Sequence, residues 1–168
     1  MKRLSNQPQV PLQKLKNNTD AYDIFPAFEL GTKKIQSGYD GLLDMINPSR
    51  KIILDGYVGV DWSEISAAIT DYFSKRGTAY RLINCADYYK PVDEIEKLTA
   101  PFLGDGDPVF GKKAKLELQD YFRSDFLSEF DSLEQVTTIV YGCGASLCGI
   151  EGRLVYFDLP KNELQYRM

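Results

Sequence analysis

One stretch of the chain, residues 51–64, limits the fold more than any other. It opens with an apolar run at 52–54, passes through a turn that contains Gly56 and Gly59, and leads into apolar residues at helical spacing. A buried strand, a glycine turn and a helix start in this order are typical of α/β proteins, which hold phosphate groups at such turns. We therefore predict a strand–turn–helix unit here.

The turn lacks the groups of a working phosphate loop. The P-loop motif G-x-x-x-x-G-K-[S/T] surrounds phosphate with backbone amides and a lysine, and its hydroxyl holds Mg²⁺. Gly56 and Gly59 are followed by no lysine and no hydroxyl in register. Asp61 precedes Glu64 at the D-x-x-E spacing of a capping box, in which the aspartate accepts backbone hydrogen bonds at the helix start. Because a carboxylate there repels phosphate, we favour a structural cap over a phosphate site.

Further strands and helices alternate along the chain. The spacing of apolar residues predicts helices at about 35–46, 62–75 and 91–102, and one long or two short helices within 116–130. Strands are predicted at 51–55, 80–84, 136–141 and 153–158. Gly77 stands where it would end the helix at 62–75. This alternation indicates an α/β fold, with a mostly parallel sheet and helices on both faces.

Composition and charge exclude several functional classes. The 168 residues, 43% of them apolar, suit one domain, which we place at 21–168 after a polar, flexible arm at 1–20. A net charge of -4 argues against nucleic acid or an anionic membrane as partner. Histidine is absent from the sequence, which excludes a Ser-His-Asp triad, a histidine-ligated zinc site and a histidine general base.

The three cysteines, Cys85, Cys143 and Cys148, indicate buried thiols. Their odd number, their apolar or glycine-rich surroundings and the lack of a signal peptide favour a reducing cytoplasm over a disulfide framework. Cys143 and Cys148 do not have the C-x-x-C spacing of a redox site. We predict no metal site.

The turns that follow the strands form the candidate site, because ligands in open α/β sheets bind beyond the carboxyl ends of the strands. The second turn, 84–91, offers Asp87 as a base and two tyrosines as a stacking surface, although an ordinary loop with core tyrosines explains it equally. The glycine-rich turn at 142–149 does not match a dinucleotide loop and predicts close backbone packing. The candidate ligand-binding residues belong to the first turn: Asp55, Gly56, Tyr57, Gly59, Asp61 and Trp62.

The order of these segments resembles that of uridine-kinase-like P-loop kinases over residues 51–168. The resemblance lies in 52–61 at the P-loop position, Asp87-Tyr88-Tyr89 after the second strand, and the strands at 136–142 and 154–160. It implies a P-loop-kinase-like three-layer sandwich. An active kinase of this type would bind ATP-Mg²⁺ through the amides of 56–59, with Asp55 or Asp61 as a metal ligand.

The chain departs from the kinase pattern in three places. Ala86 stands where the family's D-x-F-Y stretch has its first acid, so Asp87 would serve as base only in a shifted register. The lysine and hydroxyl of the phosphate loop are missing, and the chain stops at Met168, where the kinases continue into an arginine-bearing lid. Phosphoryl transfer needs cations around the γ-phosphate, whereas this loop offers carboxylates. The kinase resemblance therefore implies a degenerate active site.

The chain is more similar to the amino-terminal region of bacterial class I mannose-6-phosphate isomerase-like proteins, which place a degenerate kinase-like domain before a cupin. The matching segments are 55–62, 100–103, 107–111 and 158–168. This resemblance implies an accessory domain that senses a phosphorylated ligand and has a C-terminal cupin domain or a partner subunit beside it. Isomerase chemistry would need the cupin's metal-binding histidines, which this chain lacks.

We therefore predict a degenerate P-loop-kinase-like domain that is not an enzyme by itself and has no certain cofactor. Two alternatives stay open. One is a nucleoside or sugar kinase with an atypical phosphate loop, which would use ATP-Mg²⁺ and Asp87. The other is a protein-interaction domain in which Tyr57 and Trp62 form a docking surface, although Trp62 begins an apolar helical stripe and therefore suits the core better.

Overall fold

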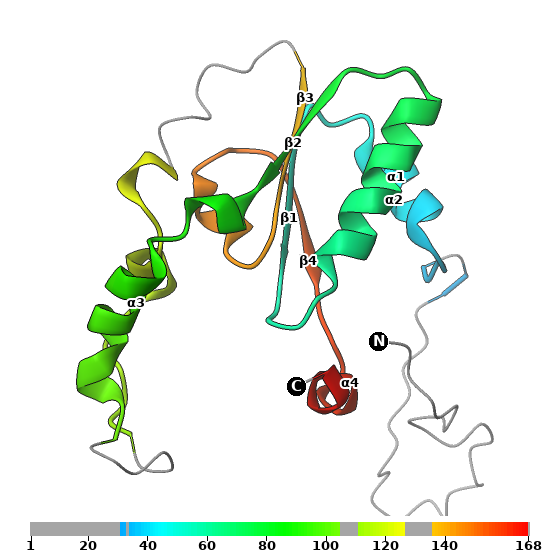
Figure 1. Ribbon diagram of the computed structural model, residues 1–168. Helices are drawn as coiled ribbons and strands as arrows, with labels where there is room; N and C mark the ends of the chain where they lie inside the picture. The colour runs from blue at the N-terminus through cyan, green and yellow to red at the C-terminus, as the bar shows by residue number, and fades with distance from the viewer. Residues whose placement is uncertain (1–30, 33, 105–110, 127–135, 168) are drawn as a thin grey trace, which may run out of the picture.

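A computed structural model describes residues 31–32, 34–104, 111–126 and 136–167. These residues form an α/β fold around a four-stranded, all-parallel sheet (Figure 1). The strands lie in the order β2-β3-β1-β4 and comprise β1 (Lys51–Gly56), β2 (Tyr80–Asn84), β3 (Thr137–Tyr141) and β4 (Arg153–Phe157). The predicted arm at 1–20 lies outside the described residues.

The central strand, β1, is buried because apolar side chains cover both faces of the sheet. Ile52 and Leu54 belong to one core cluster, whereas Ile53 belongs to the other. Ile53 pairs with Val140 of β3 on one side and with Leu154 of β4 on the other. A parallel strand covered on both faces reads as a continuous apolar run, which is the pattern that predicted β1.

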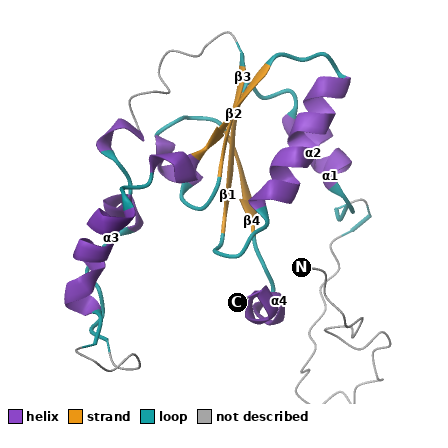
Figure 2. Cartoon of the chain, viewed as in Figure 1, coloured by secondary structure: helices purple, strands orange, loops and turns teal. Residues whose placement is uncertain are grey.

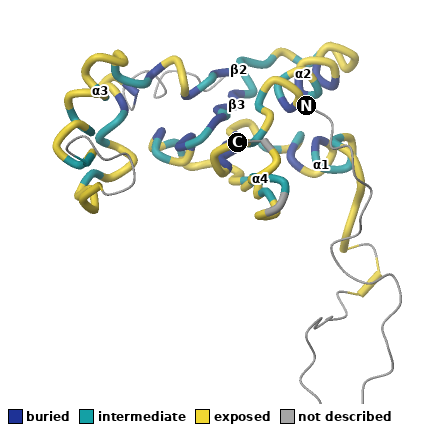
Figure 3. Tube along the Cα trace, turned by 60° about the horizontal axis from the view of Figure 1, so that its bottom comes forward, coloured by how far each residue is buried: buried dark blue, intermediate teal, exposed yellow. Residues whose placement is uncertain are grey.

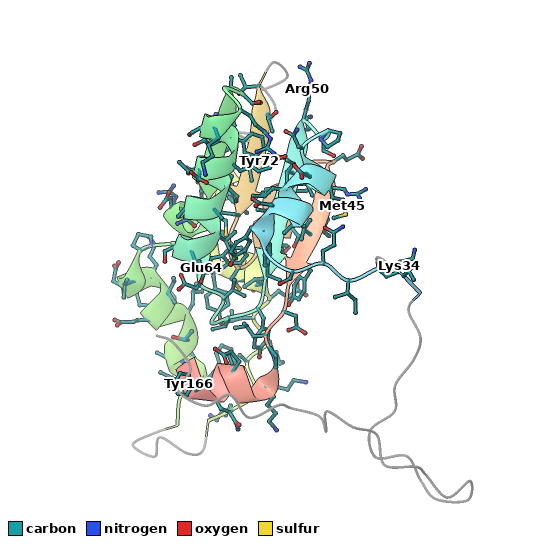
Figure 4. The ribbon with its side chains drawn as sticks, turned by 90° about the vertical axis from the view of Figure 1, so that its right-hand side faces the viewer. Lys34, Met45, Arg50, Glu64, Tyr72 and Tyr166 are labelled. Atoms are coloured by element: carbon teal, nitrogen blue, oxygen red, sulfur yellow. The ribbon has the colours of Figure 1, made fainter. Side chains whose placement is uncertain are left out.

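Two helices cover the first face, α1 (Tyr39–Ile46) and α2 (Trp62–Lys75). Tyr72 of α2 donates a hydrogen bond to Asp44 of α1 at 2.6 Å, and Figure 4 shows Tyr72 between the two helices. Gly77, with a φ of 60°, ends α2 as predicted, because its N–H binds the carbonyl of Ser74 and the next N–H binds the carbonyl of Phe73.

Short 3₁₀ turns, rather than α-helices, cover the second face (Figure 2). They span Cys85–Tyr88, Ser124–Phe126 and Ala145–Cys148, and each contributes buried side chains to the second core cluster. The helix α3 (Val92–Thr99) leaves the sheet and has no buried residue, as Figure 3 shows. Among the described residues, α-helices therefore cover one face of the sheet only, whereas helices were predicted on both faces.

Three predicted elements need correction. The helix expected from residue 35 begins at Tyr39, and the helix expected at 91–102 consists of α3 followed by a 3₁₀ turn at Ala100–Phe102. The helix or helices predicted within 116–130 are 3₁₀ turns in their described part, at Leu118–Tyr121 and Ser124–Phe126. The C-terminal helix α4 (Lys161–Arg167) was not predicted. Within the described ranges, no helix is long and apolar enough to cross a membrane.

Candidate functional site

The candidate site lies where β1 and β3 end side by side. The chain leaves β1 into α2 on the first face, whereas it leaves β3 into the 3₁₀ turn Ala145–Cys148 on the second face. Adjacent strands whose connections run to opposite faces create the crevice in which open α/β sheets bind ligands. The candidate residues of the first turn therefore stand at the expected place in the fold.

The buried carboxylate of Asp55 lies at this point between the two strand ends, which we term the crevice. Its Oδ1 accepts hydrogen bonds from the backbone N–H of Gly56 at 2.7 Å and of Gly144 at 2.9 Å. Its Oδ2 accepts from the backbone N–H of Ser146 at 3.1 Å and from the Ser146 hydroxyl. Only 8% of Asp55 is exposed. Successive backbone N–H groups of this kind form anion-binding hollows, and here the anion is the protein's own side chain.

The glycines of the 142–149 turn allow this arrangement. Gly144 has a φ of 90°, and a Cβ there would lie 2.8 Å from the ring of Phe122. Gly142 has a φ of 126° and abuts Cys85, where a Cβ would clash with the thiol. The predicted close backbone packing is confirmed. What sequence reasoning missed is the role of these amides as donors to Asp55, 89 residues earlier in the chain.

Asp61 occupies the amino terminus of α2. It is the N-cap residue, and its Oδ1 accepts hydrogen bonds from the backbone N–H groups of Ser63 and Glu64, each at 3.2 Å, which confirms the predicted aspartate cap. The Ser63 hydroxyl also donates to it, and these bonds hold the pKa of Asp61 below its ordinary value. The positive end of the helix dipole therefore faces a carboxylate that belongs to the chain.

The C-terminal helix α4 lies against the turn that follows β1, as Figure 1 shows below the carboxyl ends of the strands. Gly59 has a φ of 95°, and a Cβ there would lie 3.0 Å from Leu164 and 3.5 Å from Leu159. Gly56 is equally confined, since its Cβ would lie 2.8 Å from the carbonyl oxygen of Phe157. Both predicted glycines of the phosphate loop are thus packed against the C-terminal segment.

The two aromatic residues of the first turn differ in exposure. Tyr57 is 48% exposed. Trp62 is half-buried, and its ring packs 6.1 Å from the ring of Tyr141 and 5.7 Å from that of Phe157. Trp62 therefore contributes to the first core cluster, as its position in the helical stripe suggests, and Tyr57 remains available to a partner.

The second turn separates its acid from its aromatic residues. Asp87 is exposed in the 3₁₀ turn after β2. Tyr88 packs 5.2 Å from the ring of Phe126, and Tyr89 packs 4.6 Å from the ring of Phe122, so both tyrosines serve the second core cluster. The simpler reading of this turn, a loop with core tyrosines, agrees with these contacts.

Two of the three cysteines, Cys85 and Cys148, are buried as predicted, whereas Cys143 is only partly buried. Burial, followed by the charge of Asp55, raises the pKa of Cys85 to about 12, and burial also raises the pKa values of Cys143 and Cys148. Tyr89 donates a hydrogen bond to the carbonyl of Cys143 at 2.9 Å, and burial raises its pKa to about 12 as well. In the part of the chain that the structure describes, no group of acids and cysteines is arranged to hold a metal ion.

The crevice thus holds carboxylates that are already bound to backbone amides. Asp55 binds the amides of the 142–149 turn, and Asp61 binds those of α2. A phosphate group would need the same donors and would meet two negative charges. The arrangement is suited to holding the strand ends together rather than to transferring a phosphoryl group.

Comparison with known proteins gives a family without an assigned activity. The family model of a domain of unknown function, DUF8485, matches residues 38–168, which include every element described above. No curated protein and no solved structure matches the chain.

Proposed function

We propose that this chain, which belongs to the DUF8485 family of domains of unknown function, is a non-catalytic accessory domain on a P-loop-kinase-like scaffold. It serves a mannose-6-phosphate isomerase-like protein, in which a C-terminal cupin domain or a partner subunit carries the isomerase chemistry. Its task is to sense a phosphorylated ligand. The resemblance of segments 55–62 and 158–168 supports an isomerase-like parent protein as part of the proposal. The parallel sheet with its β1–α2 unit supports a kinase-like scaffold.

The observation that carries the proposal is the occupation of the crevice by the chain's own carboxylates. Asp55 accepts hydrogen bonds from the backbone N–H groups after β3 that an anion would otherwise bind. Asp61 accepts hydrogen bonds from the backbone N–H groups at the start of α2. A kinase needs these positions open, with cations around the transferred phosphate. Helix α4 packed on Gly59 adds a steric barrier.

The proposal predicts that nucleotides do not bind at the first turn. Thermal unfolding with and without ATP-Mg²⁺ measures this, because a ligand present at 100 times its Kd stabilises the native state by about 2.7 kcal/mol. We expect no shift that depends on the first turn and no phosphoryl transfer to nucleosides or sugars.

The opposite outcome would identify the kinase alternative. A saturable ATP-Mg²⁺ shift that disappears in Asp87→Asn and Gly59→Val, but persists in the charge-matched control Asp93→Asn, would contradict a non-catalytic role. Asp93 is exposed in α3, where it pairs with Lys97 at 3.7 Å, so it controls for the loss of one surface acid. The reading frame beyond Met168 provides an independent test, since we expect a cupin with histidine ligands there.

A protein-interaction domain is the second candidate, and exposed apolar residues favour it. Leu154 and Tyr156 are 55% and 58% exposed on β4, which is an edge strand of the described sheet. Tyr57 and Val58 add exposed apolar surface at the carboxyl end of the neighbouring strand β1. Edge strands that present apolar side chains are docking sites for other chains.

The first partner to test for this second candidate is another copy of the chain. If β4 mediates association, light scattering after size-exclusion chromatography should show a concentration-dependent dimer. The double variant Leu154→Lys, Tyr156→Lys should then be monomeric, because charged residues block edge pairing. A wild-type chain that stays monomeric at millimolar concentration would remove the support for self-association.

A further inference from the structure

A basic pocket lies at the opposite end of the sheet from the candidate site. Its volume is about 480 Å³. Because β1 and β4 pair in parallel with Ile52 opposite Arg153, the residues that precede them come side by side at the amino ends of the strands. Figure 4 shows Arg50 at one end of the molecule and Tyr166 of α4 at the other. The lining residues are Ser49, Arg50, Lys51, Glu151, Gly152 and Arg153.

The backbone of the pocket is fixed by two close contacts. The carbonyl of Arg50 accepts a hydrogen bond from the backbone N–H of Thr138 at 2.8 Å, which ties the segment before β1 to β3. A Cβ at Gly152 would lie 2.6 Å from the carbonyl oxygen of Lys51, so glycine lets the segment before β4 approach that before β1. The pocket is therefore built on the paired strands rather than on a separate loop.

The charge of the pocket is opposite to that of the chain. Arg50, Lys51 and Arg153 supply three cations against one acid, Glu151, whereas the chain as a whole carries -4. Among the described residues, none of these four forms an ion pair. The like charges of Arg50 and Arg153 repel one another, and a bound anion relieves that repulsion.

We propose that this pocket binds the phosphate group of a small phosphorylated ligand. Arg50 and Arg153 carry guanidinium forks, which bind phosphate oxygens in pairs. Lys51 precedes Ile52, the register partner of Arg153, so it lies on the other face of the sheet and adds only to the local positive potential. The hollow is open to solvent, so a ligand there would be held mainly through its phosphate group. The anion site rests on the pocket itself. The choice of a small phosphorylated compound rests on the proposed sensing function.

Glu151 allows a second test, in which a substitution should increase the affinity for phosphate instead of lowering it. Its carboxylate opposes a phosphate in the same pocket, although it can accept hydrogen bonds from the hydroxyl groups of a sugar. Loss of its charge should therefore strengthen the binding of inorganic phosphate, while loss of an arginine weakens it. A structural role for these exposed side chains would not produce opposite changes in affinity.

Isothermal titration calorimetry with inorganic phosphate and with a hexose 6-phosphate, at constant ionic strength set by chloride, tests the site. We expect saturable binding of both compounds to the wild-type chain. Arg50→Gln and Arg153→Gln should each weaken binding about tenfold, as expected for a lost charge-assisted hydrogen-bonding group. Glu151→Gln should bind inorganic phosphate several-fold more tightly, and the exposed control Lys113→Gln should bind like wild type.

Three results would overturn the inference: no saturable binding of either compound, binding that survives both arginine substitutions, or equal weakening by Lys113→Gln. Binding of inorganic phosphate without the hexose 6-phosphate would overturn the choice of a small sugar phosphate. Urea unfolding of each variant shows whether the fold is retained. Phosphoryl transfer from ATP would contradict the proposed function, yet it would leave this pocket untouched, so the two failures are distinguishable.

Discussion

Replacing Asp55 with asparagine tests the most connected side chain of the crevice. The substitution keeps the size of the side chain and one oxygen, which can still accept from Gly56 and Gly144. The new amide NH₂ then takes the place of Oδ2 and faces the backbone N–H of Ser146, which donates at 3.1 Å in the native chain. Two donors then point at each other in a site that is 8% exposed.

The loss of stability in Asp55→Asn follows from the hydrogen bonds that this substitution changes. The Ser146 hydroxyl can rotate and accept from the new NH₂, but the backbone N–H cannot, and a buried donor without a partner costs about 1–3 kcal/mol. Loss of the negative charge weakens the remaining bonds, because charge-assisted bonds are roughly twice as strong as neutral ones. We expect a total loss of about 3 kcal/mol in the free energy of unfolding, or a Tm lower by roughly 10 °C.

Urea unfolding followed by the fluorescence of Trp62, the single tryptophan, measures this loss. Asp61→Asn is the matched control, since it removes a carboxylate in the same crevice but leaves an equally good helix cap. Ser146→Ala, which removes the hydroxyl bond alone, should cost about 1 kcal/mol. An Asp55→Asn variant within about 0.5 kcal/mol of wild type, the range of ordinary surface changes, would refute the account of the crevice.

Three further substitutions test other parts of the fold. Gly59→Ala should lower the free energy of unfolding by about 1–2 kcal/mol in urea, because the φ of 95° and the nearby Leu164 both disfavour a Cβ. Gly77→Ala should cost about 1 kcal/mol in the same assay, since its φ is 60° with open space around it, so an unchanged midpoint would contradict backbone strain there. The folded-state pKa of Cys85, about 12, lies above its ordinary value of 9.0, so its contribution to stability is complete below pH 9 and is lost as the pH rises towards 12. Cys85→Ala should therefore flatten the fall in urea midpoint between pH 9 and 11, and an identical pH dependence in both proteins would exclude this thiol as the cause.

Local signals predicted the four strands and the helix α2 well. The helix α2 has the predicted bounds, and its start and end follow from two residues, Asp61 as cap and Gly77 as terminator. The strand β2 matches its predicted bounds, and β1, β3 and β4 differ by one residue at one end. Apolar runs and capping residues act within a few positions, so they can be recognised without the rest of the chain.

The one long or two short helices predicted within 116–130 do not form over the described residues 116–126, and the reason is the backbone of Phe122. Leu118, Tyr121 and Phe122 stand at helical spacing, but Phe122 has an extended backbone, with φ -98° and ψ 152°, and forms a bridge with Tyr89. Tertiary contact with the turn after β2 thus replaces a local helix by two 3₁₀ turns. Periodicity alone cannot separate these outcomes, because the apolar residues that suggest a helix include Phe122 and Phe126, which the 3₁₀ turns bury as well.

The structure brings together the turns that follow β1 and β3, where the candidate site was expected, but the hydrogen bonds between these turns were not foreseen. The sequence shows Asp55 at a strand end and a glycine-rich turn at 142–149, but nothing local joins them. Their contact depends on β1 and β3 lying side by side, and the strand order was left open by the spacing of elements. Buried polar partners far apart in sequence become visible only after the sheet is assembled.

The central position of β1 has a consequence for the growing polypeptide. Its two neighbours, β3 and β4, are made about 85 and about 100 residues later, so β1 leaves the ribosome long before either pairing surface exists. At a translation rate of roughly 5–20 residues per second, Ile52 to Leu54 stay unpaired for several seconds. A nascent chain that stalls before residue 137 carries an apolar strand with no native partner, which makes it a client for chaperones and a seed for aggregation.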